Sequence, residues 1–258
     1  MQNLRDVMPP NPTHEPHFRR KGMIPIDRYI YAAMAIAYAV LLFVGLSVMR
    51  RRGTVEQRDL VLLVLFGLFY DNAVIAVGSA IGEGDTLRVL SYPRFWLHAL
   101  FTPLLVVVAV DIARSARIRG WFNRSLPIVL AWVVTLGLIV YQSLAVTSRE
   151  VANLKLEDEY GALRYGTSAE ASYPIMVLAA AAAVLLVGAI LTFRRRWPWM
   201  LVGVGVLVLG RAIPIDIDSS ALTNIFELLL LVSILFTIRH FDRNRDRAQW
   251  SSAPTAIP

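Results

Sequence analysis

Long apolar runs separated by short, arginine-rich polar segments dominate the pattern of this chain. Six runs are long enough to cross a bilayer as helices, which takes about 20 apolar residues, and a seventh is shorter. In chain order they are residues 29–49, 60–82, 94–116, 125–146, 173–193, 199–213 and 221–238. The pattern predicts an all-α fold, a polytopic membrane helix bundle with seven transmembrane helices. Whether the sixth helix, which ends near Pro214, crosses completely stays open.

The composition supports this class. Of 258 residues 56% are hydrophobic, against about 45–50% in a soluble domain. The chain has no cysteine, which excludes disulfides, thiolate metal sites and cysteine nucleophiles. The net charge of +7 comes mainly from arginines at the ends of apolar runs, not from a continuous basic domain. We therefore expect the lipid bilayer as a partner and no nucleic acid.

The arginines indicate an orientation. Four groups lie at residues 50–58, 114–124, 194–196 and 239–247, in loops that alternate along the chain. With seven crossings all four lie on one side, which the positive-inside rule makes cytoplasmic. We expect the N-terminus outside and the C-terminus in the cytoplasm, although Arg19, Arg20 and Lys21 argue mildly against it.

This orientation divides the chain into three parts. Residues 1–27 form a polar, proline-rich extracytoplasmic arm without the order of a cleavable signal peptide. Residues 28–240 form the seven-helix transmembrane domain, and residues 241–258 a basic cytoplasmic tail. The expected location is a bacterial plasma membrane, that is, an inner membrane. The acidic segment 147–172 is either an ordered lid or a flexible loop, because Gly161, Tyr165 and Gly166 allow a folded-over turn.

Several polar groups interrupt the apolar runs. An ionisable group at this depth costs several kcal/mol unless it faces a cavity or a partner, so it is a functional candidate. In the predicted orientation most of them lie in the outer half of the membrane, with Asp71 as the floor. We predict that they line a ligand-binding pocket open to the extracytoplasmic side, formed by Asp71, Asn72, Arg94, His98, Arg211 and Glu227.

Each candidate also has a structural interpretation. In this interpretation Asp71 pairs with Arg94 or Arg211, and His98 bonds to a neighbouring helix. The two arginines extend to the membrane interface. Arg94 follows Pro93 and is expected in the first turn of its helix. Asp111 is interpreted as an interfacial ion pair with Arg114, three residues on.

Two functions fit this pocket. In the first, the protein binds or translocates an anionic or lipid-like small molecule, alone or with membrane-protein partners as a subunit of a larger complex. Arginine suits this role because its planar fork bonds carboxylate or phosphate. In the second, Asp71, His98 and Glu227 make a metal-dependent lipid hydrolase. The estimated depths of Asp71 and His98 differ by roughly 9 Å along the helix axes, so lipid binding or transport is favoured. Whether the protein is an enzyme stays undecided.

The sequence lacks the residues that several other membrane-protein chemistries require. Retinal proteins need a lysine in the last span, and the seventh run has none. Seven-helix zinc hydrolases and bis-histidine haem proteins need more intramembrane histidines than His98 alone. No HExxH or GxSxG motif is present. The sequence therefore predicts no metal ligands and identifies no cofactor.

Overall fold

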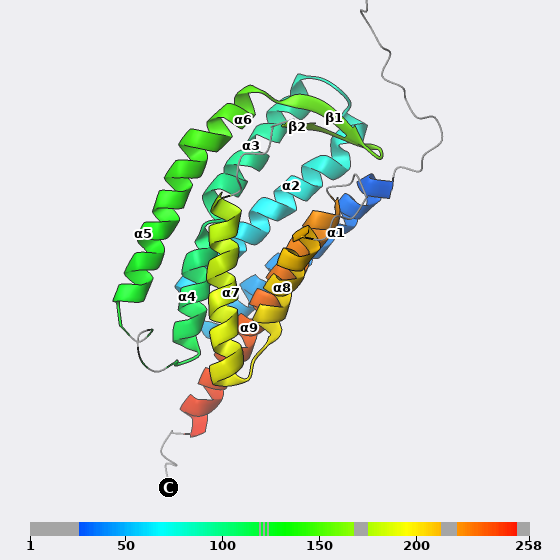
Figure 1. Cartoon of the computed structure of the whole chain (residues 1–258). Coiled ribbons are helices and arrows are strands. Elements are labelled where there is room, and N and C mark those ends of the chain that lie inside the picture. Colours follow the sequence, from blue (N-terminus) through cyan, green and yellow to red (C-terminus); the bar gives the residue numbers. More distant parts are fainter. Residues whose placement is uncertain are drawn as a thin grey trace, which may run out of the picture.

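The computed structural model describes residues 26–118, 120, 122, 124–167, 175–212 and 221–251, without the side chains of 211, 212 and 246–251. The described chain is mainly helical, with one β-hairpin (Figure 1). The longer helices are α1 (Ile26–Arg52), α2 (Val61–Ile81), α3 (Asp85–Phe101), α4 (Leu104–Ser115), α5 (Leu126–Tyr141), α7 (Ile175–Arg195), α8 (Trp199–Ala212) and α9 (Ala221–Ser251). The shorter elements are η1 (Gln57–Leu60), η3 (Gln142–Thr147), α6 (Ser148–Ala152), β1 (Lys155–Glu159) and β2 (Ala162–Gly166).

The helices match the apolar runs and support an integral membrane protein. Among the described residues, six helical segments are long and apolar enough to cross a membrane, and the helix 199–210 is shorter. Large apolar side chains cover the exterior: Phe43, Leu144 and Phe193 are 73%, 71% and 83% exposed. Such a surface is unusual for a soluble monomer and ordinary in lipid, whose tails are as apolar as leucine.

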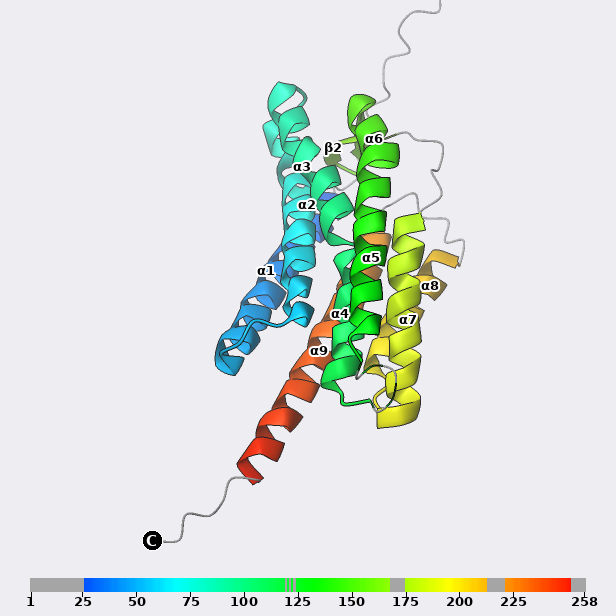
Figure 2. The same ribbon diagram turned by 90° about the vertical axis from the view of Figure 1, so that its left-hand side faces the viewer.

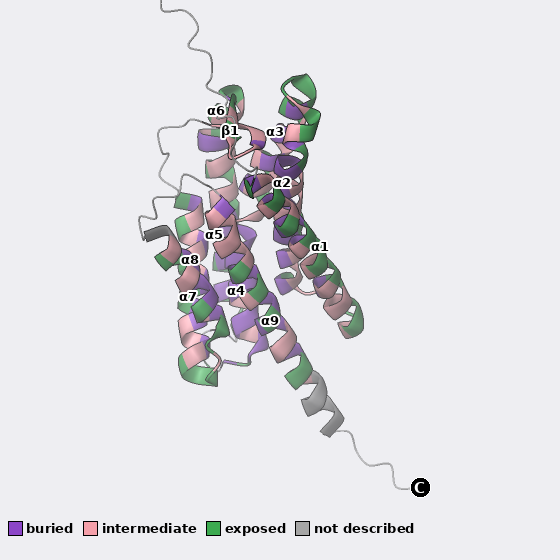
Figure 3. Ribbon diagram, turned by 90° about the vertical axis from the view of Figure 1, so that its right-hand side faces the viewer, coloured by how far each residue is buried: buried purple, intermediate pink, exposed green. Residues whose placement is uncertain are grey.

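Helix α4 lies inside the bundle, between α5, α7 and α9 (Figures 1 and 3). Val107, Val108, Ala109, Ile112 and Ala113 have no exposed surface. The first seven residues of α4 are all apolar, and its two charged residues lie in its second half, where Asp111 pairs with Arg58; this composition suits the position of α4 in the interior. Helix α1 packs on α2 and α9, and α8 packs on α7 and α9.

The third apolar run differs from its predicted boundary. Helix α3 begins at Asp85 and carries Pro93 in its interior, so Arg94 does not open the helix. Together α3 and α4 form a 31-residue span, interrupted at Thr102 and Pro103. The interruption follows from Pro103, which has no N–H to donate to the preceding turn. Helix α9 runs from Ala221 to Ser251 and so includes the first residues of the expected basic tail.

The acidic segment after the fourth run contains an ordered β-hairpin. Strands β1 and β2 pair antiparallel, with Glu159 opposite Ala162. Tyr160 and Gly161 between them have φ of +43° and +83°, as a two-residue hairpin turn of this handedness requires. Across the strands, Arg164 Nε donates to Glu157 Oε2 at 3.2 Å. Burial lowers the pKa of Arg164, but the carboxylates of Glu159 and Glu157 outweigh it and raise the pKa, so the cation persists.

A buried ion network joins α9 to the segment after α1. The Arg58 side chain is 1% exposed, and its Nη2 donates to Asp242 Oδ1 at 2.6 Å. Arg52 Nη1 donates to the other oxygen of Asp242 at 2.8 Å. Asp111 joins the network through Arg58 Nη1, at 3.3 Å. Its ion-pair partner is therefore Arg58 and not the predicted Arg114, because helix packing brings together groups 53 residues apart.

Candidate functional site

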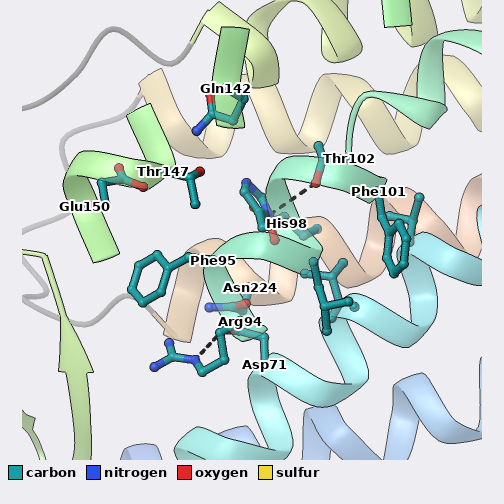
Figure 4. Close-up of a pocket in the computed structure, with 15 residues that line it drawn as sticks. Asp71, Arg94, Phe95, His98, Phe101, Thr102, Gln142, Thr147, Glu150 and Asn224 are labelled. Atoms are coloured by element: carbon teal, nitrogen blue, oxygen red, sulfur yellow. Dashed lines mark hydrogen bonds and ion pairs between the residues drawn. The ribbon is translucent and has the colours of Figure 1, made fainter. Parts of the chain in front are cut away.

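A cavity of about 190 Å³, with several charged and polar side chains in an otherwise apolar wall, lies between α2, α3, the α5–α6 segment and α9 (Figure 4). Four of the six predicted residues line it: Asp71, Arg94, His98 and Glu227. They come from three helices and meet near the hairpin end of the bundle. The lining also includes Thr102, Gln142, Thr147, Glu150 and Asn224.

The other two predicted residues, Asn72 and Arg211, are not among the lining residues described. Asn72 is fully buried but is not among the lining residues, and its Nδ2 donates to Leu68 O at 2.8 Å. It follows Asp71 directly, so it points about 100° further round the helix. Arg211 belongs to α8, but its side chain lies outside the described residues.

Arg94 joins α2 to the hairpin. Its Nε donates to Asp71 Oδ1 at 2.7 Å, and its Nη1 donates to the carbonyl oxygen of Tyr165 at 3.1 Å. The Arg94 side chain is 8% exposed and that of Asp71 24%. A pair this buried persists because the charges compensate each other and the remaining donors find acceptors. Much of the positive charge of Arg94 is therefore already balanced.

The hairpin covers α2 beside this pair. Ser79 Oγ donates to the carbonyl oxygen of Gly161 and accepts from Leu163 N at 3.1 Å. Gly78 permits the contact, because a Cβ there would overlap the Leu163 carbonyl oxygen. The hairpin is thus an ordered cover fixed to α2 and, through Arg94, to α3.

His98 lies on the face of α3 that looks across the cavity toward Thr147 and Glu150 (Figure 4). Its Nδ1 is 3.2 Å from Thr102 Oγ1. Thr102 precedes the Pro103 interruption, so the histidine is held where the helix bends.

A π-helical turn forms the wall facing His98. Segment η3 carries Gln142 and Thr147, and both line the cavity. Thr147 is 1% exposed, yet its Oγ1 has no hydrogen-bond partner within the described residues. A buried hydroxyl without a partner costs about 1–3 kcal/mol, and single π turns occur frequently at functional sites. A polar ligand atom would satisfy this oxygen.

A smaller, apolar space of about 40 Å³, which we call the apolar extension, lies beside the cavity. Val64, Leu68, His98, Thr102 and Glu227 line both parts. Beyond them the walls are apolar side chains of α4, α7, α8 and α9, including Ala181, Val184, Leu207 and Leu231. His98 and Glu227 therefore mark a boundary between a polar chamber and an apolar slot.

The residues expected for a metal-dependent hydrolase do not assemble into a metal site. Within the described ranges, no three histidine or carboxylate side chains are grouped so that they could hold a metal ion. Asp71 is instead bonded to Arg94. This part of the chain therefore offers no observation that favours the hydrolase hypothesis.

Sequence reasoning missed three polar lining residues: Gln142, Thr147 and Glu150. Gln142 could have been identified from the sequence, because an amide side chain inside an apolar run indicates a polar site in the same way as a charged one does. Thr147 and Glu150 carried none, because they follow the run that was expected to end at residue 146. Comparison with known proteins adds nothing to this assignment: no protein-family model matches the chain, and no curated protein matches it.

Proposed function

We propose that this integral membrane protein binds or translocates a lipid-like amphiphile, with its polar head in the cavity and its chain in the apolar extension. The observation that carries the proposal is the shared boundary of the two spaces at His98 and Glu227. A site with a polar chamber at one end and an apolar slot at the other matches a molecule with the same division.

The dimensions favour a small head and a single chain. A volume of 190 Å³ corresponds to about six water molecules at roughly 30 Å³ each, enough for a compact head group. By the same measure the extension of 40 Å³ holds little more than one group of that size, so it excludes a fused ring system and takes only the first carbon atoms of one alkyl or acyl chain. Since Arg94 is bonded to Asp71 and Tyr165, the lining supports a lipid-like ligand better than a small free anion.

The polar contacts assign roles within this proposal. Thr147 Oγ1 and the ring of His98 bond the head group from opposite walls. The Arg94–Asp71 pair forms the wall beneath the hairpin and offers hydrogen bonds without a large net charge. Glu227 lies where the head meets the chain. The hairpin is held beside the cavity by the bonds of Ser79 to Gly161 and Leu163 and by the bond of Arg94 to the Tyr165 carbonyl oxygen.

The membrane topology is part of the proposal: seven spans, the N-terminus outside, the C-terminus inside, in a bacterial plasma membrane. In support, the arginine-bearing segments 50–58, 114–117 and 194–196 lie at the end where α9 leaves the bundle, opposite the hairpin (Figures 1 and 2). Because the chain has no cysteine, Lys155→Cys and Arg243→Cys can report each side separately. Only Lys155→Cys should react with an impermeant maleimide in intact cells; the opposite pattern would reverse the topology.

Blocking the apolar extension tests the ligand assignment. Ala181 lines the extension, whereas the adjacent Ala182 is exposed on the outer surface of α7. Amphiphiles that co-purify with the protein in mild detergent are extracted and quantified by mass spectrometry. Ala181→Phe should lower the amount bound by about tenfold, the effect of a 1.4 kcal/mol clash, and Ala182→Phe should leave it unchanged. Equal amounts in both variants would reject the proposal.

A further inference from the structure

A second pocket lies at the other end of the bundle, where α4 and α7 end beside α9 (Figures 1 and 3). Its volume is about 230 Å³, and residues 115–117, Arg195, His240, Asn244 and Arg245 are among those that line it. We call it the basic pocket. It shares no lining residue with the cavity described above, so the inference stands independently of the proposed function.

Positive charge dominates the basic pocket. Arg117, Arg195 and Arg245 bring three guanidinium groups from three helices, and none of the lining residues described is a carboxylate. Two of the arginines are held in place: Arg195 Nη2 donates to the carbonyl oxygen of Arg117, and Arg245 Nη1 donates to Glu56 Oε1 at 3.1 Å. Glu56, which is outside the lining, balances the charge of Arg245, so Arg117 and Arg195 carry the positive charge that a bound anion would compensate.

Arg117 has an unfavourable backbone conformation for a side chain. It follows the end of α4 with φ of +51°, and its N–H donates to Arg114 O at 2.9 Å. This position after a helix usually takes glycine, because a Cβ is strained there. An arginine here makes the turn less favourable than glycine would. Its exposed side chain, which lines the pocket, offers a reason for its presence.

The carbonyl groups at these helix ends do not need the arginines. Ala116 N donates to Ile112 O at 3.0 Å, and Arg196 N donates to Thr192 O at 3.0 Å. Backbone groups thus cap both helices in the usual way. Arg245 is paired with Glu56, and Arg195 donates one bond to the Arg117 carbonyl oxygen, so Arg117 and Arg195 are the arginines that keep donors for a ligand.

Aromatic side chains place the pocket at the depth of lipid head groups. Trp197 Nε1 donates to Thr237 Oγ1 at 3.0 Å, and its ring stacks on His240 with centroids 3.7 Å apart. Tryptophan is enriched at the interface between membrane and water, where the lipid head groups lie. Phe193, one turn before the pocket, is 83% exposed, so apolar surface for acyl chains adjoins the charged site.

We propose that the basic pocket binds the phosphate of an anionic phospholipid head group. Guanidinium groups bond phosphate oxygens in pairs, and basic pockets between membrane helices bind anionic lipid head groups in this way. Arg117 and Arg195 hold the phosphate, while His240 and Asn244 form the remaining wall. The acyl chains lie along α7 beside Phe193.

The test uses the full-length protein, delipidated in detergent and titrated with phosphatidylglycerol or phosphatidylcholine. Lipid adducts are counted by native mass spectrometry. Arg117→Gln should lower phosphatidylglycerol binding by about fivefold, the effect of one arginine at a membrane surface. The matched control is Arg50→Gln, which removes an exposed arginine of the same end outside the pocket. Equal loss in both variants would overturn the proposal, because it would reduce the effect to net charge.

Arg117→Gly separates ligand binding from a structural role. Glycine takes a φ of +51° without strain, so the variant should fold with an equal or higher Tm and still lose phosphatidylglycerol binding. Unchanged binding in Arg117→Gly would overturn the proposal. A last experiment adds inorganic phosphate or glycerophosphate as a competitor. Both should compete only weakly with phosphatidylglycerol for the pocket. Complete displacement of phosphatidylglycerol at equal concentration would assign the pocket to a soluble phosphate instead of a lipid.

Discussion

Gly78 is the position where a single methyl group should separate the hairpin from the bundle. In Gly78→Ala the added Cβ would overlap the Leu163 carbonyl oxygen and come within 3.1 Å of the carbonyl carbon. Both atoms belong to backbone, which cannot rotate away as a side chain could. The hairpin therefore has to lift from α2, and the two Ser79 bonds to Gly161 and Leu163 lengthen or break.

The size of the effect follows from those bonds. Each is worth about 0.5–1.5 kcal/mol, so losing both weakens docking by about 2 kcal/mol. The higher helix propensity of alanine does not offset this loss, because α2 is helical whether or not the hairpin is docked. A change of 2 kcal/mol raises the undocked population about 30-fold. If the Arg94 bond to Tyr165 is also lost, the increase is larger.

Proteolysis at Lys155 measures the undocked population. The chain has only two lysines, Lys21 and Lys155, so cleavage by a lysine-specific protease at β1 gives fragments of known mass. Cleavage within a paired strand requires local opening, and its rate follows the open population when reclosing is fast. Gly78→Ala should be cut at Lys155 about 30 times faster than the wild type.

Gly137 provides the matched control. It lies on the exposed side of α5, and a Cβ there meets no atom within 4 Å. Gly137→Ala should leave the Lys155 cleavage rate within about twofold of the wild type, as a neutral surface substitution does. If both alanine variants are cut at the wild-type rate, the hairpin is not held by its contact with α2, and the description of an ordered cover is wrong.

Three further predictions concern buried polar groups. Arg58→Met should lower stability by about 3–5 kcal/mol, since it removes the only ion-pair partner of Asp111 within the described residues and one of the two arginines paired with Asp242, whereas Arg50→Met should not; equal midpoints in denaturant titrations would contradict the network. Asp71→Asn should reduce the amphiphile that co-purifies more than Asp111→Asn does, and equal losses would remove Asp71 from the site. Thr147→Val should weaken that binding yet raise the Tm of the ligand-free protein, because it removes a buried hydroxyl without a partner; a lower Tm would mean that the hydroxyl is satisfied.

The long apolar helices were predictable because bilayer crossing requires a length and an apolar composition that can be read directly from the local sequence. The hairpin was not, because its strands are charged and its stability comes from Gly78, Ser79 and Arg94, which are distant in sequence. The sequence permitted a turn at Gly161 but could not show what it would pack against.

The candidate site was predictable in part, as the fold was. Asp71, Arg94, His98 and Glu227 were detectable because lipid excludes such groups, and they line one cavity. The estimate of the depths of Asp71 and His98 used helix rise alone, and the sequence did not show where the third span is interrupted, at Thr102 and Pro103. Asp111 shows the same limit, since the local partner Arg114 is visible in sequence and the actual partner Arg58 is not.

The most direct test of the amphiphile assignment is an experimental density map of the protein purified with its native lipids. The account predicts one continuous, elongated density that begins between Arg94 and His98, passes Glu227 and ends beside Ala181 and Val184. Separate peaks of ordered water in the polar chamber, with no density in the apolar extension, would contradict it.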